Sequence, residues 1–283
     1  MDRNIDRPEP PARTPQQRTL GKLRANPVRP REQTYPLADQ PRSVYEFRDK
    51  SYRLNPNEAR MLSEVGMFRT IQKSDLLKSV YGGQQALFDR DLTHLHRQNL
   101  VRIVGPKGSP NKYIVLTKPA RELTQKHLRA NPQQEIYSGA VKLREIKHDA
   151  ALYRVYAKAA SQIEARGGKP VRVALDFEFK RRMNRELVRI RQLPKDQQQK
   201  RLQEIAQREN LKVVEGKIPL PDLRLEYETA DGNRSFCDLE LTTEHYRSHT
   251  IAQKRAAGFQ LYGTSHRGRA AHGPDLMGGI LSL

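Results

Sequence analysis

The chain has 283 residues and a formal net charge of +20 at pH 7, with 52 Lys and Arg against 32 Asp and Glu. This excess of cations predicts a polyanionic partner, and the length suffices for two small domains with tails. The sequence has no apolar run of membrane-spanning length, and its N-terminal residues lack the apolar stretch of a secretory signal. Its single cysteine, Cys237, excludes an intramolecular disulfide and a cysteine-based zinc site. We therefore expect a cytoplasmic protein.

Residues 1–52 have the composition of a disordered, basic, proline-rich tail. Half of the 18 prolines precede Asn57, and arginines recur throughout the segment. Few apolar residues are available to offset the entropy of ordering such a segment. A tail of this kind would either add phosphate contacts or serve as a solubilising leader.

The next segment, residues 53–125, begins with a clear helix-start signal. Asn55 suits the N-cap, Pro56 suits the first helical position, and Glu58 can complete a capping box. The apolar stripe of this helix is followed by Gly66, at which we expect the helix to end.

Two further helices and a β-hairpin follow in the same segment. One helix begins at Ser74, and the next spans residues 84–99 with apolar residues at helical spacing. Residues 100–104 and 112–116 have the composition of two strands joined by a Gly- and Pro-rich loop. This order predicts a winged helix-turn-helix.

A winged helix of this kind places its third helix in the major groove of DNA and its loop over phosphates. The alternative is a winged helix used for protein contacts or dimerisation. Cations and amides on the third helix and loop favour DNA. The expected contacts are made by Gln85, Arg90, Thr93, Arg97, Lys107 and Lys112.

Residues 126–138 form a predicted linker to a second domain over residues 139–263. Its first helix, expected over residues 141–166, carries Glu145, His148 and Asp149 close together on its first half. No partner with metal-ligand spacing is evident for His148. Side chains of this kind are most simply explained as solvated surface.

Residues 171–179 alternate apolar and polar residues as a strand does, and Asp176 and Glu178 lie on its polar face. Residues 180–211 then form a basic helical insertion that turns at Pro194. Its cations would either clamp DNA or belong to a solvated insertion. The candidate clamp residues are Arg181, Arg182 and Arg185.

A β-hairpin follows the insertion, and its apolar residues determine the parity of its register. If both apolar sets face one side, odd-numbered residues must oppose odd-numbered residues. A three-residue loop over 231–233 gives this parity and sets Leu225 opposite Leu239 and Tyr227 opposite Cys237.

The polar face of this hairpin gathers Asp222, Asp238 and Glu240, with Asp222 and Glu240 on a cross-strand diagonal. Carboxylates this close repel one another, and a hard divalent cation such as Mg²⁺ would relieve the repulsion. The alternative is an exposed sheet face with ordinary acidic residues.

These residues resemble a known arrangement. Pro221-Asp222, followed by Asp238-Leu239-Glu240, resembles the active-site strands of the PD-(D/E)xK nuclease fold. Together with the upstream helices, residues 54–262 resemble the replication-relaxation family of bacterial and plasmid proteins. The nuclease pattern has Lys two residues after the acidic residue, where this chain has Thr242. In some members of the fold this lysine lies on the following helix instead, and Lys254 matches that position.

The resemblance implies a catalytic set of Asp222, Glu240 and Lys254. It also implies Mg²⁺ or Mn²⁺ held by Asp222, Asp238 and Glu240, with Glu145 or Asp149 as a peripheral ligand. A final strand is usual in this fold, but residues 264–283 have the composition of a flexible basic tail in which only residues 280–283 could form a strand.

The expected fold is therefore α+β: a winged helix-turn-helix followed by an α/β PD-(D/E)xK nuclease-like domain with a basic helical insertion. One function class is a metal-dependent endonuclease that nicks or cleaves plasmid or mobile-element DNA during replication or relaxation. The other is a non-catalytic DNA-binding factor or regulator with a degenerate nuclease-like domain. The expected partner is double-stranded DNA, and no association with a membrane is expected. A second copy of the chain and replication or mobilisation proteins are further candidate partners.

Overall fold

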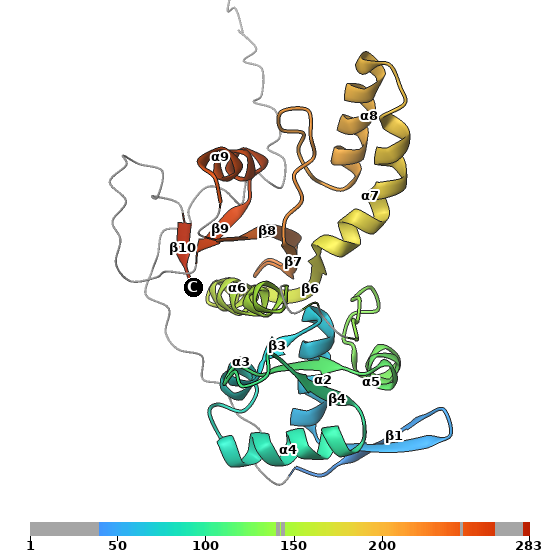
Figure 1. Ribbon diagram of the computed structural model, residues 1–283, viewed down its shortest axis with the longest axis vertical. Coiled ribbons are helices and arrows are strands. Elements are labelled where there is room, and N and C mark those ends of the chain that lie inside the picture. Colours follow the sequence, from blue (N-terminus) through green and yellow to red (C-terminus); the bar gives the residue numbers. More distant parts are fainter. Residues whose placement is uncertain (1–39, 140–141, 143–144, 244–245, 264–279) are drawn as a thin grey trace, which may run out of the picture.

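The computed structural model describes residues 40–283 apart from 140–141, 143–144, 244–245 and 264–279 (Figure 1). The chain combines helices and strands in two halves, one built before and one built after the uncertain residues near 140. Within the part of the chain that is described, no helix is long and apolar enough to cross a membrane.

A β-hairpin opens the first half, formed by antiparallel strands β1 (Ser43–Phe47) and β2 (Lys50–Leu54). The predicted disordered tail over residues 1–52 is therefore wrong for residues 43–52, and residues 1–39 lie outside the described part. The hairpin is ordered because alternate residues of β2, Tyr52 and Leu54, are buried in the core.

The first half continues through three helices and a three-stranded sheet. Its elements are α2 (Pro56–Phe68), β3 (Ile71–Gln72), α3 (Lys73–Ser79), α4 (Gln85–Arg97), β4 (Val101–Val104) and β5 (Tyr113–Leu116). The strands pair antiparallel in the order β3-β5-β4.

The start of α2 confirms the predicted capping box, because the Asn55 side chain accepts from the backbone of Glu58 and the Glu58 side chain accepts from the backbone of Asn55. The predicted end at Gly66 is wrong, since α2 continues to Phe68. Gly66 is instead a packing position. A Cβ atom there would lie 2.7 Å from Cγ2 of Ile136.

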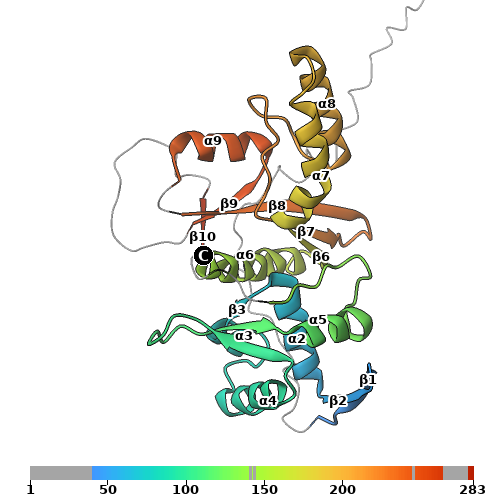
Figure 2. The ribbon, with the colours of Figure 1, turned by 45° about the vertical axis from the view of Figure 1, so that its right-hand side comes forward.

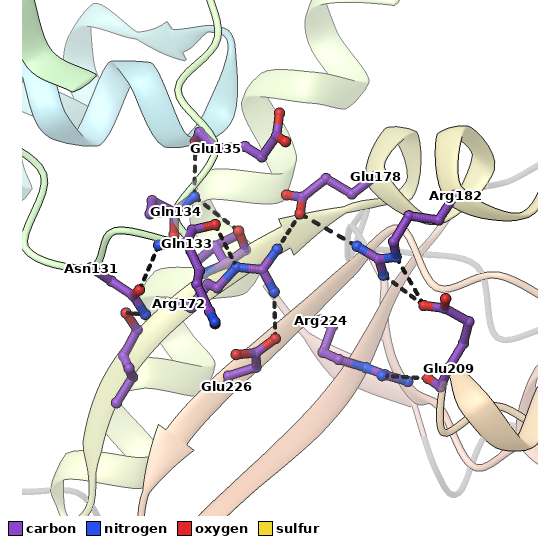
Figure 3. A network of polar contacts seen from close by, with 12 residues as sticks. Asn131, Gln133, Gln134, Glu135, Arg172, Glu178, Arg182, Glu209, Arg224 and Glu226 are labelled. Carbon is purple, nitrogen blue, oxygen red and sulfur yellow. Dashed lines mark hydrogen bonds and ion pairs between the residues drawn. The ribbon is translucent and has the colours of Figure 1, made fainter. Parts of the chain in front are cut away.

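The segment predicted as a linker, residues 126–138, is docked on both halves. It follows α5 (Lys118–Leu123) and includes most of a short π-helix (Thr124–Leu128). The Tyr137 amide donates to the Gly66 carbonyl at 2.8 Å. The Gln134 side-chain amide bonds the backbone of Val173 at 2.8 and 2.9 Å (Figure 3). Gln134 thereby satisfies an edge strand that would otherwise present free backbone groups.

The second half is a five-stranded sheet between helices. Its elements are α6 (Ile146–Glu164), β6 (Lys169–Leu175), α7 (Asp176–Ile190), α8 (Lys195–Arg208), β7 (Leu223–Glu228), β8 (Arg234–Thr242), α9 (Ser248–Ala257), β9 (Gln260–Gly263) and β10 (Ile280–Ser282). The strand order is β10-β9-β8-β7-β6, antiparallel from β6 to β8 and parallel from β8 to β10. Helix α6 covers one face, and α7, α8 and α9 lie on the other side (Figures 1 and 2).

Two separate apolar clusters hold these layers together. The cluster between the sheet and α6 is continuous with the core of the first half. The second cluster lies under α7, α8 and α9 and includes Ala174, Phe179, Met183 and Phe259. The two halves therefore share one core.

The strand predicted over residues 171–179 ends at Leu175, and Asp176 begins α7. The local reason is that acidic residues favour the first turn of a helix. Phe179 and Met183 are four residues apart and both are buried in the second cluster. The predicted helical turn near Pro194 is confirmed by the break between α7 and α8.

The β7–β8 register keeps the predicted parity but is shifted by two residues. Leu223 opposes Leu239 and Leu225 opposes Cys237. The shift follows from a longer loop, residues 229–233, which lies beyond the last pair Glu228 and Arg234. Residues 280–282, in the part of the predicted tail that the sequence allowed as a strand, form β10 beside β9, while residues 264–279 lie outside the described part.

Arg42 lies against two buried carboxylates and provides a test of this fold. Its guanidinium is 3.3 Å from Glu58 Oε1 and 3.7 Å from Asp91 Oδ1, and both carboxylates are completely buried. We expect Arg42→Ala to lower the free energy of unfolding by about 1–3 kcal/mol, because it leaves two buried carboxylates with less compensation. Urea unfolding measures this change. Arg53→Ala, on the exposed face of β2, is the matched control, and equal losses in both variants would contradict the account.

Candidate active site

Asp222 and Glu240 lie side by side where β7 begins and β8 approaches its end. The Asp222 amide donates to Glu240 Oε2 at 3.2 Å, and the Leu241 amide donates to Asp222 Oδ2 at 2.9 Å. The shifted register places the two residues on opposed positions instead of the predicted diagonal. The Glu240 side chain is buried and the Asp222 side chain is partly exposed.

Lys254 reaches the same carboxylate from α9. Its Nζ lies 2.7 Å from Glu240 Oε1 and donates to the Leu220 carbonyl at 2.7 Å. Ile251, one turn earlier, packs in the second apolar cluster and turns this face of α9 toward the sheet. Gly258 then ends α9 with φ of 94°, a left-handed conformation that leads directly into β9. The structure thus brings Asp222, Glu240 and Lys254 together.

Tyr246 is a member of this cluster that the sequence analysis did not identify. Its hydroxyl donates to Glu240 Oε1 at 2.8 Å. Burial, followed by the nearby Asp222 carboxylate, raises the pKa of Glu240, whereas Lys254 and Tyr246 oppose the rise. Burial and the carboxylate of Glu240 also raise the pKa of the Tyr246 hydroxyl well above its ordinary value. Tyr246 therefore acts as a neutral donor that holds Glu240.

Asp238 does not join this cluster. Arg224 stands opposite it on β7 and contacts it at 2.6 and 2.9 Å. Arg224 also donates to the carbonyls of Glu209 and Asn210 at 2.7 and 3.0 Å. The predicted register would have set Glu226 opposite Asp238, so the two-residue shift explains the difference. Asp238 is thus a partner of Arg224 and lies outside the cluster in which the sequence analysis placed it.

His148 contacts Asp222 from the first turns of α6. Its Nε2 lies 3.5 Å from Asp222 Oδ2, and its Nδ1 lies 3.7 Å from Asp149 Oδ1. The carboxylate of Asp149 and then that of Asp222 raise the pKa of His148 to about 10, against the opposing effect of burial. These two carboxylates therefore favour the charged form of His148. The sequence showed His148 beside Asp149 but carried no sign of its contact with Asp222.

Asp149 connects this cluster to the first half of the molecule. Its Oδ2 accepts from Nη1 of Arg69 at 3.1 Å, and Arg69 follows α2 directly. The Arg69 guanidinium also stacks on the Phe177 ring, 4.3 Å from its centre. Glu145, the other candidate peripheral ligand, is the N-cap residue of α6.

The carboxylate pair is the part of the molecule that suits a divalent cation. Within the described ranges, no three His, Cys, Asp or Glu side chains gather closely enough to hold a metal by themselves. Mg²⁺ commonly uses one or two carboxylates, several waters and substrate phosphate. A carboxylate offers about four lone-pair positions. The contacts named above do not occupy all of the lone-pair positions of Asp222 and Glu240. These two residues fit Mg²⁺ or Mn²⁺, and Asp238 does not.

Asp176 and Glu178, the acidic residues of the strand expected over residues 171–179, direct their side chains to partners outside this cluster. Glu178 is buried against Arg172 and accepts from the Tyr137 hydroxyl at 3.1 Å. Asp176 is paired with Lys180 one turn further along α7. The Asp176 amide donates to the Asp222 carbonyl at 3.1 Å, so the backbone of Asp176 stays beside the carboxylate pair while its side chain does not join it.

The residues predicted to contact DNA from the first half lie on its surface. Gln85, Arg90, Thr93 and Arg97 are exposed on α4, whose opposite side is buried through residues such as Leu92. Lys107 is exposed in the loop between β4 and β5. Lys112 is half-buried and donates to the Pro106 carbonyl at 3.2 Å.

The predicted clamp residues of α7 are partly engaged in local ion pairs. Arg181 contacts Glu135. Arg182 contacts Glu209 at 2.9 Å and Glu178 at 3.7 Å (Figure 3). Arg185 is exposed. Carboxylates therefore offset two of the three cations, which weakens the case for a clamp at this position.

No protein-family model matches the chain. No curated protein matches it significantly either. The fold and the geometry of the site therefore carry the functional argument.

The high pKa of His148 is directly measurable. We expect its imidazole to titrate near pH 10, since the neighbouring carboxylates favour its charged form. Asp149→Asn should lower this pKa because it removes the leading cause of the shift. NMR of the ring protons against pH measures both values. A midpoint near 6.5 in the unaltered protein would contradict the described contacts.

Proposed function

We propose that the chain is a DNA-binding phosphodiesterase of the PD-(D/E)xK type, with a winged helix as its DNA-reading half. The observation that carries this proposal is the convergence of Asp222, Glu240 and Lys254 from two strands and the following helix. The resemblance of residues 54–262 to the replication-relaxation family adds the expected setting, namely plasmid or mobile-element DNA during replication or relaxation.

The topology of the first half supports the DNA-reading part. Its order of helix, strand, helix, helix and two strands, with the sheet order β3-β5-β4, is the order expected of a winged helix and supports this part of the proposal. In such a unit the last helix, here α4, enters the major groove. The exposed polar face of α4 and the exposed Lys107 suit this docking.

The chemistry would proceed on a phosphodiester placed beside Asp222 and Glu240. A bound divalent cation lowers the pKa of a water and stabilises charge on the phosphate. Asp222 and Glu240 would hold that cation, and Tyr246 fixes the orientation of Glu240. Lys254, whose Nζ lies 2.7 Å from Glu240 Oε1, would stabilise the transition-state phosphate or orient the attacking water.

Local charge compensation supports the approach of an anionic substrate. Asp222 is accompanied by the His148 cation and Glu240 by the Lys254 cation. Without such compensation, two carboxylates would repel a phosphate. The net charge of +20 favours DNA binding over the molecule as a whole.

A second candidate function is that of a winged-helix DNA-binding factor without turnover. Three observations favour it: Thr242 occupies the usual lysine position, Asp238 is paired with Arg224, and Glu240 is fully buried. In this case the carboxylate pair would serve only to position α9 and the strands.

Nicking of supercoiled plasmid separates the two candidates. We expect relaxation to the nicked form with Mg²⁺ or Mn²⁺ and none with EDTA. Asp222→Ala, Glu240→Ala and Lys254→Ala should each lower the rate by about 10²-fold or more, because each removes a group that acts on the reacting phosphate. Lys200→Ala, on the exposed face of α8, is the control. Tight, salt-sensitive binding without any nicking would favour the second candidate.

The role of α4 is tested by the salt dependence of binding. We expect Arg97→Ala to weaken duplex binding and to reduce the slope of log K against log salt by about 1, as loss of one phosphate contact does. Fluorescence anisotropy across salt concentrations measures both quantities. Arg234→Ala, at the β7–β8 loop, should leave the slope unchanged. Identical slopes for the Arg97 variant and the unaltered protein would contradict the proposal that α4 contacts DNA.

A further inference from the structure

The loop between β4 and β5, residues 105–112, lies next to the start of α6. Val104 and Tyr113, which flank this loop, pack with Ile146 and Ala150 in a small apolar cluster. In Figure 2 the loop extends to the same side of the molecule as α9. Since His148 follows Ile146 by two residues and contacts Asp222, the first turn of α6 connects the loop to the carboxylate pair.

The segments that make this connection carry four lysines, which we call the basic strip. Lys107 and Lys112 lie in the β4–β5 loop, Lys142 precedes α6, and Lys147 is in its first turn. Lys107, Lys142 and Lys147 are exposed, and Lys112 is half-buried. Lys147 lies between Ile146, which contacts the loop strands, and His148, which contacts Asp222. Lys142 and Lys147 are not among the residues expected from the sequence to contact DNA.

The first half, which carries α4, and the second half, which carries the carboxylate pair, are held in a fixed relation by packing between them. The Phe68 ring lies 5.2 Å from the Tyr153 ring of α6 in an edge-on contact. The Tyr153 hydroxyl bonds Ser79 and Glu64 of the first half, and Arg69 pairs with Asp149. Close-packed interiors of this kind transmit position and do not slide. Helix α4 and the carboxylate pair therefore keep one separation.

We propose that the basic strip binds the phosphates of one continuous DNA duplex running from α4 to Asp222 and Glu240. This proposal rests on the function proposed above and adds the path of the substrate. It has a direct consequence for specificity. Because the packed interface fixes the separation of α4 and the carboxylate pair, the strand is cut at one offset from the bound sequence, on the side of the β4–β5 loop.

Hydroxyl-radical footprinting tests the path independently of cleavage. The experiment uses the full chain carrying Asp222→Ala, without divalent metal, on a duplex selected for tight binding. We expect one continuous protected stretch. Adding Lys147→Glu should shorten it from one end and weaken binding about tenfold, because a phosphate contact becomes a repulsion. Lys147→Gln should act in the same direction with a smaller effect.

The matched control is Lys169→Glu, which makes the same charge change at the start of β6, beyond the opposite end of α6. It should leave the protected stretch unchanged, and circular dichroism of each variant checks folding. A protected stretch that Lys147→Glu does not shorten, in a folded protein, would overturn the proposal.

Mapping of nicks made by the unaltered chain with Mg²⁺ separates the path from the chemistry. Nicks at one offset from the protected sequence support the basic strip. Nicks scattered over many offsets would overturn the strip while leaving the phosphodiesterase in place. A continuous footprint that Lys147→Glu shortens, without any nicks, would support the strip and reject cleavage.

Discussion

Lys254 lies 2.7 Å from Glu240, a carboxylate with no exposed surface, and this contact shows how the second half is assembled. A buried charge without a partner costs several kcal/mol, so each buried acid needs a cation from a neighbouring element. Arg224 compensates Asp238 and also anchors the end of α8 through two carbonyls. Arg42 does the same for Glu58 and Asp91 in the first half. These pairs place α9, α8 and the start of β1 on the body of the protein.

The same constraint explains why the candidate site lies where it does. Asp222, just before β7, lies beside Glu240. The Glu240 carboxylate accepts a hydrogen bond from the Asp222 amide, and the Asp222 carboxylate accepts one from the Leu241 amide. Their cations come from different layers, Lys254 from α9 and His148 from α6. The pair is thus held between the two helical layers. Through Asp149 and Arg69 it is also connected to the DNA-reading half that we propose.

Much of this could be predicted from residues that act locally. The capping box at Asn55 and Glu58 depends on four consecutive positions, and the parity of the β7–β8 pair depends on simple alternation. The predictions that were wrong concerned features that depend on contacts between residues distant in the sequence. The register shift depends on a loop of residues 229–233, and the order of residues 43–52 depends on burial of Tyr52 and Leu54 against other elements. The contact between His148 and Asp222 joins residues more than seventy positions apart, and no periodic pattern signals such a contact.

The central claim is that Asp222 and Glu240 form a site for a divalent cation, and binding of Mn²⁺ without DNA tests it most directly. Electron paramagnetic resonance of free Mn²⁺ in a titration with the full chain gives the number of bound ions and their affinity. The account predicts a bound ion that is lost in Asp222→Ala and in Glu240→Ala and retained in Glu226→Ala, which changes a neighbouring acid on β7. Binding that is absent, or that persists in both site variants, would contradict the account and leave the proposed DNA-binding function without a metal centre at this position.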